Sequence, residues 1–127
     1  MDSSYGSGAA FRHSADDTAD FQRGIYLPWL HQEAKRRNPS ILTYALSVGV
    51  PAFVGNGSYL SPGGVRYHTD YLQGARDVHN ITFDYLGIWN EGPWSRRYVV
   101  DLRAALDESG FGKTRIVVPD GHSSHRR

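Results

Sequence analysis

The chain alternates between stretches with helical periodicity and short apolar runs. In the first of three such blocks, the apolar face of the predicted helix consists of Tyr26, Trp29, Leu30 and Ala34. Charged residues fill the opposite face, and Asn38-Pro39 ends the helix. Pro28 lacks an amide hydrogen, so it either begins this helix or kinks it. The apolar run 41–50 then predicts a strand buried on both faces.

The second and third blocks repeat this order. After a glycine-rich loop at 55–58, a helix ending near His79 is predicted to bury Tyr67, Tyr71, Ala75 and Val78. A strand at 81–89 follows. Ser95 is expected to cap the next helix and Gly110 to end it. Its predicted inner face is Tyr98 or Val99, Leu102, Ala105 and Leu106, and a third strand is predicted at 114–118.

The resulting order αβαβαβ, with short connections, predicts an α/β fold with a parallel sheet and crossover helices. Such a sheet is either an open doubly wound sheet or part of a closed barrel, and a complete barrel needs about 250 residues. Three strands of eight would leave two uncovered sheet edges, which favours a piece of a larger barrel. Residues 1–127 are therefore interpreted as a fragment of one domain, with a loop or disordered start at 1–18 and a polar tail at 122–127.

Composition and charge narrow the classes of function. Among the 127 residues, 39% are hydrophobic and 13% aromatic, which is typical of a globular domain. The net charge of +1 favours neither nucleic acid nor an anionic membrane as a partner. Without cysteine, a thiolate metal site is excluded, and no cofactor is expected. The chain shows no signal peptide or spanning segment, and Asn56 and Asn80 lie in glycosylation acceptor triplets.

The strongest candidate for chemistry follows the second predicted strand, which runs directly into Trp89-Asn90-Glu91. In a barrel, side chains at the carboxyl ends of strands face the substrate. Glu91 is therefore a candidate general acid, and Asn90 is suited to hold a sugar hydroxyl. Trp89 offers an apolar wall that would raise the pKa of a nearby carboxylic acid. The competing interpretation is that Glu91 is an ordinary solvated carboxylate.

Other polar residues are weaker candidates. Asp120 follows the third strand, where it either faces the same mouth or belongs to a simple turn with Gly121. Asp84, inside the second strand, is interpreted as a buried, hydrogen-bonded structural acid. His13 is interpreted as solvated, and no pair of histidines has the spacing of a helical zinc site. Gly55-Asn56-Gly57 lacks the remaining residues of a nucleotide-binding loop.

A family resemblance covers most of the chain. It rests on Trp29-Leu30, Glu33-Ala34, residues 35–39, Pro51, residues 55–57, Gly74-Ala75 and residues 84–91. In order and spacing these resemble the galactocerebrosidase family, glycoside hydrolase family 59. The resemblance implies a (β/α)8 TIM barrel, of which this chain supplies roughly strands three to five. It further implies that Glu91 ends strand four as proton donor and then base, and that Asn90 binds the sugar beside the scissile bond.

The same resemblance implies a substrate, a compartment and a partner. These are the galactosyl bond of galactosylceramide and related galactolipids, the lysosome, and a saposin-like protein that presents the lipid. The family usually has a tryptophan where Val48 stands and another where Phe53 stands. Phe53 keeps an aromatic face for sugar or lipid packing, whereas Val48 does not.

A retaining glycosidase needs two carboxyl groups, and the family places its nucleophile at the end of strand seven. That nucleophile is expected to be missing from this chain, so the 127 residues alone should show little turnover. Two alternatives stay open: a retaining barrel glycosidase of different sugar specificity, kept open by Val48, and a truncated, non-catalytic fragment that folds only with a partner.

Overall fold

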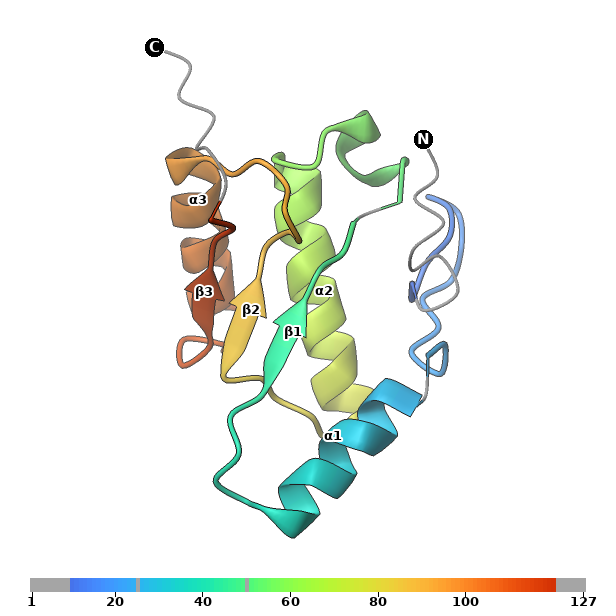
Figure 1. Cartoon of the computed structure of the whole chain (residues 1–127). Helices are drawn as coiled ribbons and strands as arrows, with labels where there is room; N and C mark the ends of the chain where they lie inside the picture. The colour runs from blue at the N-terminus through green and yellow to red at the C-terminus, as the bar shows by residue number, and fades with distance from the viewer. Residues whose placement is uncertain (1–9, 25, 50, 121–127) are drawn as a thin grey trace.

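The predicted order of helices and strands is confirmed by a computed structural model that describes residues 10–24, 26–49 and 51–120 (Figure 1). The elements are α1 (Tyr26–Arg37), β1 (Tyr44–Leu46), the short 3-10 helix η2 (Val54–Gly57), α2 (Pro62–His79), β2 (Tyr85–Gly87), α3 (Arg96–Glu108) and β3 (Arg115–Val117). In this part of the chain, no helix is long and apolar enough to cross a membrane.

The three strands form a parallel sheet in the order β1-β2-β3. Tyr85 of β2 pairs with Tyr44 of β1 on one side and with Arg115 of β3 on the other. Because all strands run the same way, their carboxyl ends lie at one edge of the sheet (Figure 1). The α/β fold with a parallel sheet is thus confirmed, whereas closure of this sheet into a barrel stays a prediction.

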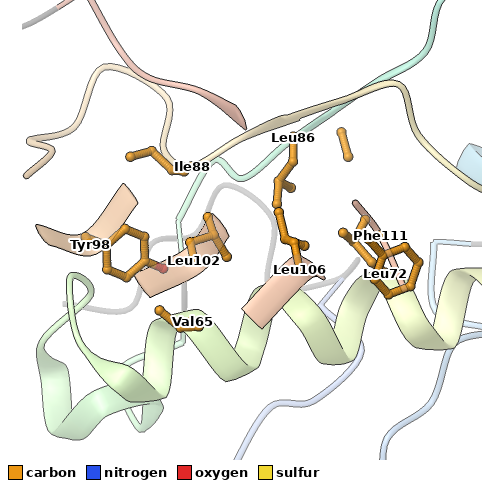
Figure 2. Close-up of a cluster of buried hydrophobic side chains, with 9 residues drawn as sticks. Val65, Leu72, Leu86, Ile88, Tyr98, Leu102, Leu106 and Phe111 are labelled. Atoms are coloured by element: carbon orange, nitrogen blue, oxygen red, sulfur yellow. The ribbon is translucent and has the colours of Figure 1, made fainter. Parts of the chain in front are cut away.

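The hydrophobic core lies between one face of the sheet and the helices α2 and α3. Leu86 and Ile88 point from the β2 segment toward Leu102 and Leu106 of α3, and α2 closes the layer from below (Figure 2). All four of these side chains are almost completely buried. Burying a leucine or isoleucine of this kind contributes about 1.5–3 kcal/mol. This layer fixes the position of β2 and therefore of the residues that follow it.

The opposite face of the sheet is open, which corrects the expectation that 41–50 is a strand buried on both faces. Within the described residues 41–49, only Tyr44–Leu46 forms a strand, and of these three residues Ala45 alone is buried. Tyr44 and Leu46 are 49% and 41% exposed. Both side chains lie over Gly87, where an added Cβ would come within 2.1 Å of the Tyr44 hydroxyl oxygen. The apolar side chains of β1 that point away from the core are therefore exposed, because no second layer of the described residues covers them.

The predicted apolar face of α1 is also uncovered. No residue of this helix is buried, and Trp29 is 62% exposed. The helix is held by polar contacts instead, with a 3.2 Å contact between His31 Nε2 and the Thr82 carbonyl oxygen. Gln32 Nε2 donates to the His79 carbonyl oxygen at 2.9 Å. Pro28 lies inside the first turn and does not interrupt the helix.

Helix α2 ends at His79 as predicted, but its buried face is rotated from the expected one. The buried residues are Gly64, Val65, His68, Thr69, Leu72, Gly74 and Ala75. Of the predicted set, Ala75 is buried, Tyr67 and Tyr71 are half-buried, and Val78 is exposed. The difference arises because glycine, histidine and threonine occupy part of the inner face. The spacing of hydrophobic residues therefore does not identify the buried side of this helix.

The ends of the helices follow their local sequence. The Ser61 side chain accepts a hydrogen bond from the Gly64 amide at 3.3 Å, with Pro62 in the first turn. Ser95 caps α3 as predicted, since its hydroxyl oxygen accepts from the Tyr98 amide at 3.2 Å. Gly110 follows α3 with a φ of 84°, a conformation that favours glycine.

The start of the chain is better ordered than a frayed end from residue 10 onward. Phe11 is buried, and its ring stacks on Phe21 at 5.0 Å and on Tyr67 at 4.7 Å. Residues 10–18 contain turns but no helix or strand, as the expected loop requires. Residues 1–9 of that loop and the predicted tail 122–127 lie outside the described residues.

Candidate active site

Glu91 lies at the carboxyl edge of the sheet, four residues after β2 ends. The intervening backbone is held on both sides. The Ile88 amide donates to the Val117 carbonyl oxygen at 3.1 Å, and the Asn90 amide donates to the Ser47 carbonyl oxygen at 2.8 Å. The segment that carries Asn90 and Glu91 is therefore anchored to both neighbouring strands, while both side chains are exposed.

The backbone of Glu91 is strained. Its φ is 53°, in the left-handed region that a side chain with a Cβ rarely adopts. Holding an L-residue there costs roughly 1–2 kcal/mol, and such strain persists only where surrounding contacts impose it. Among the described residues, the other non-glycine positions of this kind are Asn56 and Asn80, and asparagine tolerates the conformation well. Glu91 is thus the unexpected residue in this group.

The Trp89 side chain packs against the protein interior behind the bend at residues 89–92. Its indole ring stacks on the ring of Tyr59, with centroids 4.1 Å apart and planes inclined by 17°. On the other side of the bend, Gly92 is buried, and a Cβ added there would lie 2.1 Å from indole Cδ2. Gly92, directly after the Asn90-Glu91 pair, thus packs against the indole of the residue directly before the pair. Direct contact of Trp89 with a sugar stays a prediction.

A buried polar cluster lies behind Trp89, and the sequence pattern did not indicate it. The Tyr59 hydroxyl is 3.2 Å from His68 Nε2, and the Tyr98 hydroxyl is 3.0 Å from His68 Nδ1. His68 Nδ1 also lies 2.9 Å from the Gly64 carbonyl oxygen. Burial lowers the pKa of His68, against smaller opposing effects of the Gly64 and Ile88 backbone. It also raises the pKa of both tyrosines, so all three groups are neutral near pH 7.

The other predicted substrate-side residues lie after the neighbouring strands. Asp120 is exposed and follows β3, so it belongs to the same edge of the sheet as Glu91. Val48, 50% exposed, follows β1 at that edge. Phe53 is half-buried, and the Arg12 guanidinium lies 5.5 Å from its ring centroid. One face of the Phe53 ring is therefore already in contact with a cation.

Asp84 lies just before β2, near the opposite edge of the sheet from Glu91. Its carboxylate accepts hydrogen bonds from the Thr43 amide at 2.8 Å and the Thr43 hydroxyl at 3.0 Å. The Thr43 backbone amide, with smaller effects of its hydroxyl and of Lys35, lowers the pKa of Asp84. The expected structural, hydrogen-bonded acid is confirmed, although its side chain is 39% exposed rather than buried.

No group of three or more metal-ligating side chains occurs among residues 10–24, 26–49 and 51–120. His13 is exposed, and its backbone amide donates to Asp17 Oδ2 at 3.0 Å. A shallow groove of about 310 Å³ lies over the outer side of α2, lined by the side chains of Phe11, Phe21, Asp70, Gln73 and others. It is formed by residues other than those of the 89–92 segment.

Comparison with known proteins decides the family. The sequence profile described as Glycosyl hydrolase family 59 matches residues 1–126. The chain belongs to this family. It is 39% identical over 120 residues to the galactocerebrosidase of Danio rerio, 36% identical over 96 residues to that of Mus musculus, and 34% identical over 96 residues to that of Homo sapiens.

These alignments cover most of the family 59 chain but little of its relatives. They include 91% of this chain against 18% of the Danio rerio protein, and 72% against 14% of the Homo sapiens protein. The chain spans less than a fifth of the length of these curated relatives. Membership of the family is therefore shown, and the activity of a whole protein is a proposal.

Proposed function

We propose that this chain carries the acid/base carboxylate of a retaining β-glycosidase, and that the carboxylate is Glu91. The observation that carries the proposal is the placement of this glutamate, in a family 59 chain, on a strained and anchored bend at the carboxyl edge of the sheet. Strained backbone is concentrated at functional sites. An ordinary surface glutamate would gain nothing from a left-handed conformation that glycine or asparagine adopts at lower cost.

The proposed chemistry has two steps. In the first, Glu91 protonates the glycosidic oxygen as the aglycone leaves and a second carboxylate attacks the anomeric carbon. In the second, the Glu91 carboxylate removes a proton from water, which attacks the same carbon and releases the sugar. Asn90 is proposed to hydrogen-bond the sugar beside the scissile bond, and Asp120 to contact substrate from the neighbouring strand end.

The second carboxylate is proposed to come from a strand outside these 127 residues. A retaining pair has carboxyl groups about 5–5.5 Å apart. Asp84 lies at the other end of the strands, and Asp120 follows β3, the neighbouring strand of the sheet. The open sheet face with Tyr44 and Leu46 is proposed to be the inner face of a (β/α)8 barrel, which further strands would complete.

The proposed substrate is the galactosyl bond of galactosylceramide and related galactolipids, because the relatives bear the name galactocerebrosidase. A lysosomal location and a saposin-like lipid-presenting partner are proposed on the same ground. One observation favours a second candidate, a retaining glycosidase for another sugar. Val48 offers no aromatic platform at the strand end, and the Phe53 ring is occupied on one side by Arg12.

The acid/base role can be tested in a chimera. The matching segment of the Danio rerio galactocerebrosidase is replaced by this chain, and hydrolysis of aryl β-galactosides is measured. Glu91→Gln is expected to lower kcat/KM at least 100-fold for a phenyl galactoside, whose leaving group needs protonation. The loss should be much smaller for a 2,4-dinitrophenyl galactoside, which leaves without an acid. Asp120→Asn serves as the matched carboxylate control and should not show this dependence on the leaving group.

Azide separates the proposed role from a general loss of activity. In Glu91→Ala, azide is expected to restore turnover and to give a β-galactosyl azide, because it attacks the glycosyl-enzyme without a general base. An equal loss for both leaving groups, without azide rescue, would refute Glu91 as the acid/base. Preference for another aryl glycoside over the galactoside would favour the second candidate.

A further inference from the structure

We propose that Tyr59 and His68 are positioning residues that hold the 89–92 segment, and with it Glu91, in its strained bend. This inference rests on the proposed function only for its consequence in catalysis. The connection is a continuous series of contacts. His68 contacts the Tyr59 hydroxyl, and the Tyr59 ring stacks on the Trp89 indole. Gly92 lies against the same indole.

The hydrogen-bond partners assign the proton on His68. The Gly64 carbonyl oxygen can only accept, so the Nδ1 atom 2.9 Å away from it must carry a hydrogen. In the neutral ring, Nε2 is then a bare acceptor, and the Tyr59 hydroxyl must donate to it. This donation fixes the hydroxyl end of Tyr59 and thereby the plane on which Trp89 stacks. The Tyr98 oxygen lies 3.0 Å from Nδ1 on the side of α3, and the Ile88 backbone also acts on the ring.

The cluster lies where three elements meet behind the bend. Tyr59 comes from the loop before α2, His68 from α2 and Tyr98 from α3, so three elements converge behind one segment. Ser47 holds the bend from the side of β1, because its carbonyl oxygen accepts a hydrogen bond from the Asn90 amide at 2.8 Å. A buried polar group that loses its hydrogen-bond partner destabilises the structure by an amount comparable to the strain at Glu91.

Hydrogen exchange of single amides tests the proposal on the 127-residue chain, without any substrate. The Asn90 amide reports opening of the bend, and the Leu102 amide in α3 reports opening of the core. Tyr59→Phe, which keeps the ring but removes the hydroxyl, is expected to speed exchange at Asn90 about tenfold relative to Leu102. His68→Leu should have at least this effect. His68→Gln, whose Oε1 can accept from Tyr59, should restore the Asn90 rate to within about threefold of wild type.

A matched control is Tyr71→Phe, which removes the hydroxyl of a half-buried tyrosine from the same helix as His68. Tyr71 packs on Phe83 and Phe11, so the Asn90 rate should be unchanged. A second readout is the 19F resonance of 5-fluorotryptophan at position 89, which should lose most of its ring-current shift in Tyr59→Leu. The resonance of the exposed Trp29 should stay in place.

Two results would overturn the proposal. One is an unchanged Asn90 rate in Tyr59→Phe, and the other is an equal acceleration at Asn90 and Leu102, which would mean that the cluster holds the whole fold. If His68→Leu fails to fold, Tyr59→Phe and His68→Gln still decide between these results. None of these rates depends on catalysis. A chimera that loses no activity in Glu91→Gln would therefore refute the proposed function and leave the positioning result standing.

Discussion

At the scale of single residues, the most informative position is Glu91, because the proposed role of its side chain and the conformation of its backbone favour different residue types. The proposed chemistry requires a carboxylate, whereas a φ of 53° favours glycine or asparagine. A residue that is poorly suited to its own conformation is retained where its side chain has a function. Stability and activity are therefore expected to diverge when this position is substituted.

This divergence can be measured. Glu91→Gly should be more stable than Glu91→Ala by about 1 kcal/mol, because glycine relieves the left-handed strain and alanine does not. Glu91→Asn should fall between them. The measurement is urea unfolding of the chain, followed by circular dichroism. Equal stability of the glycine and alanine variants would contradict the strained conformation, whatever the role of the carboxylate.

At the scale of elements, the start of α2 shows how closely the loop after β1 approaches the helix. Gly64 is buried, and a Cβ added to it would lie 2.0 Å from the Tyr59 carbonyl oxygen and 3.0 Å from the Tyr98 hydroxyl oxygen. The first contact is with backbone, which cannot move aside as a flexible side chain can. The glycine thus permits the packing that brings Tyr59 to His68.

Gly64→Ala is accordingly expected to destabilise the chain by about 1–3 kcal/mol, the usual cost of overpacking. Gly112→Ala is the matched control, since its nearest neighbour is not backbone but the exposed Asp107 carboxylate at 3.2 Å. That substitution should change the free energy of unfolding by less than about 0.5 kcal/mol. Thermal unfolding of both variants provides the comparison. A tolerated Gly64→Ala would show that the Tyr59 loop is free to retreat from α2.

At the scale of the whole molecule, the sheet has one covered face and one open face. Tyr44, Leu46 and Val48 are exposed on or beside β1, which is an outer strand of the described sheet. Exposed apolar side chains next to an unpaired strand edge promote association between chains. In a barrel, the same residues would be enclosed by further strands.

The 127-residue chain is therefore expected to self-associate as its concentration rises. The double variant Leu46→Lys/Val48→Lys should sediment as a monomer over the same range, because it places charge on the open face. Val100→Lys, at an exposed position on α3, is the control and should not change association. Sedimentation velocity distinguishes these outcomes. A wild-type chain that stays monomeric at all concentrations would argue against an exposed interior face.

The sequence by itself determined the kind and order of the elements. Ser95 and Gly110 mark the ends of α3, because capping and turn preference depend on neighbours along the chain. The strand preceding Glu91 was predicted at 81–89, and the observed strand is its central part, Tyr85–Gly87. Glu91 and Asn90 could be proposed from the same local pattern together with the family resemblance. The buried contacts behind these two residues could not be predicted from that pattern.

Burial and the contacts behind the site were decided only by the tertiary structure. The apolar run at 41–50 predicted a covered strand, yet whether a face is covered depends on what packs against it, and β1 meets helices on one side only. The cluster at His68 escaped prediction for a related reason. Its partners Tyr59 and Tyr98 lie 9 and 30 residues away in sequence, and a histidine becomes a buried acceptor only when folding brings such partners together.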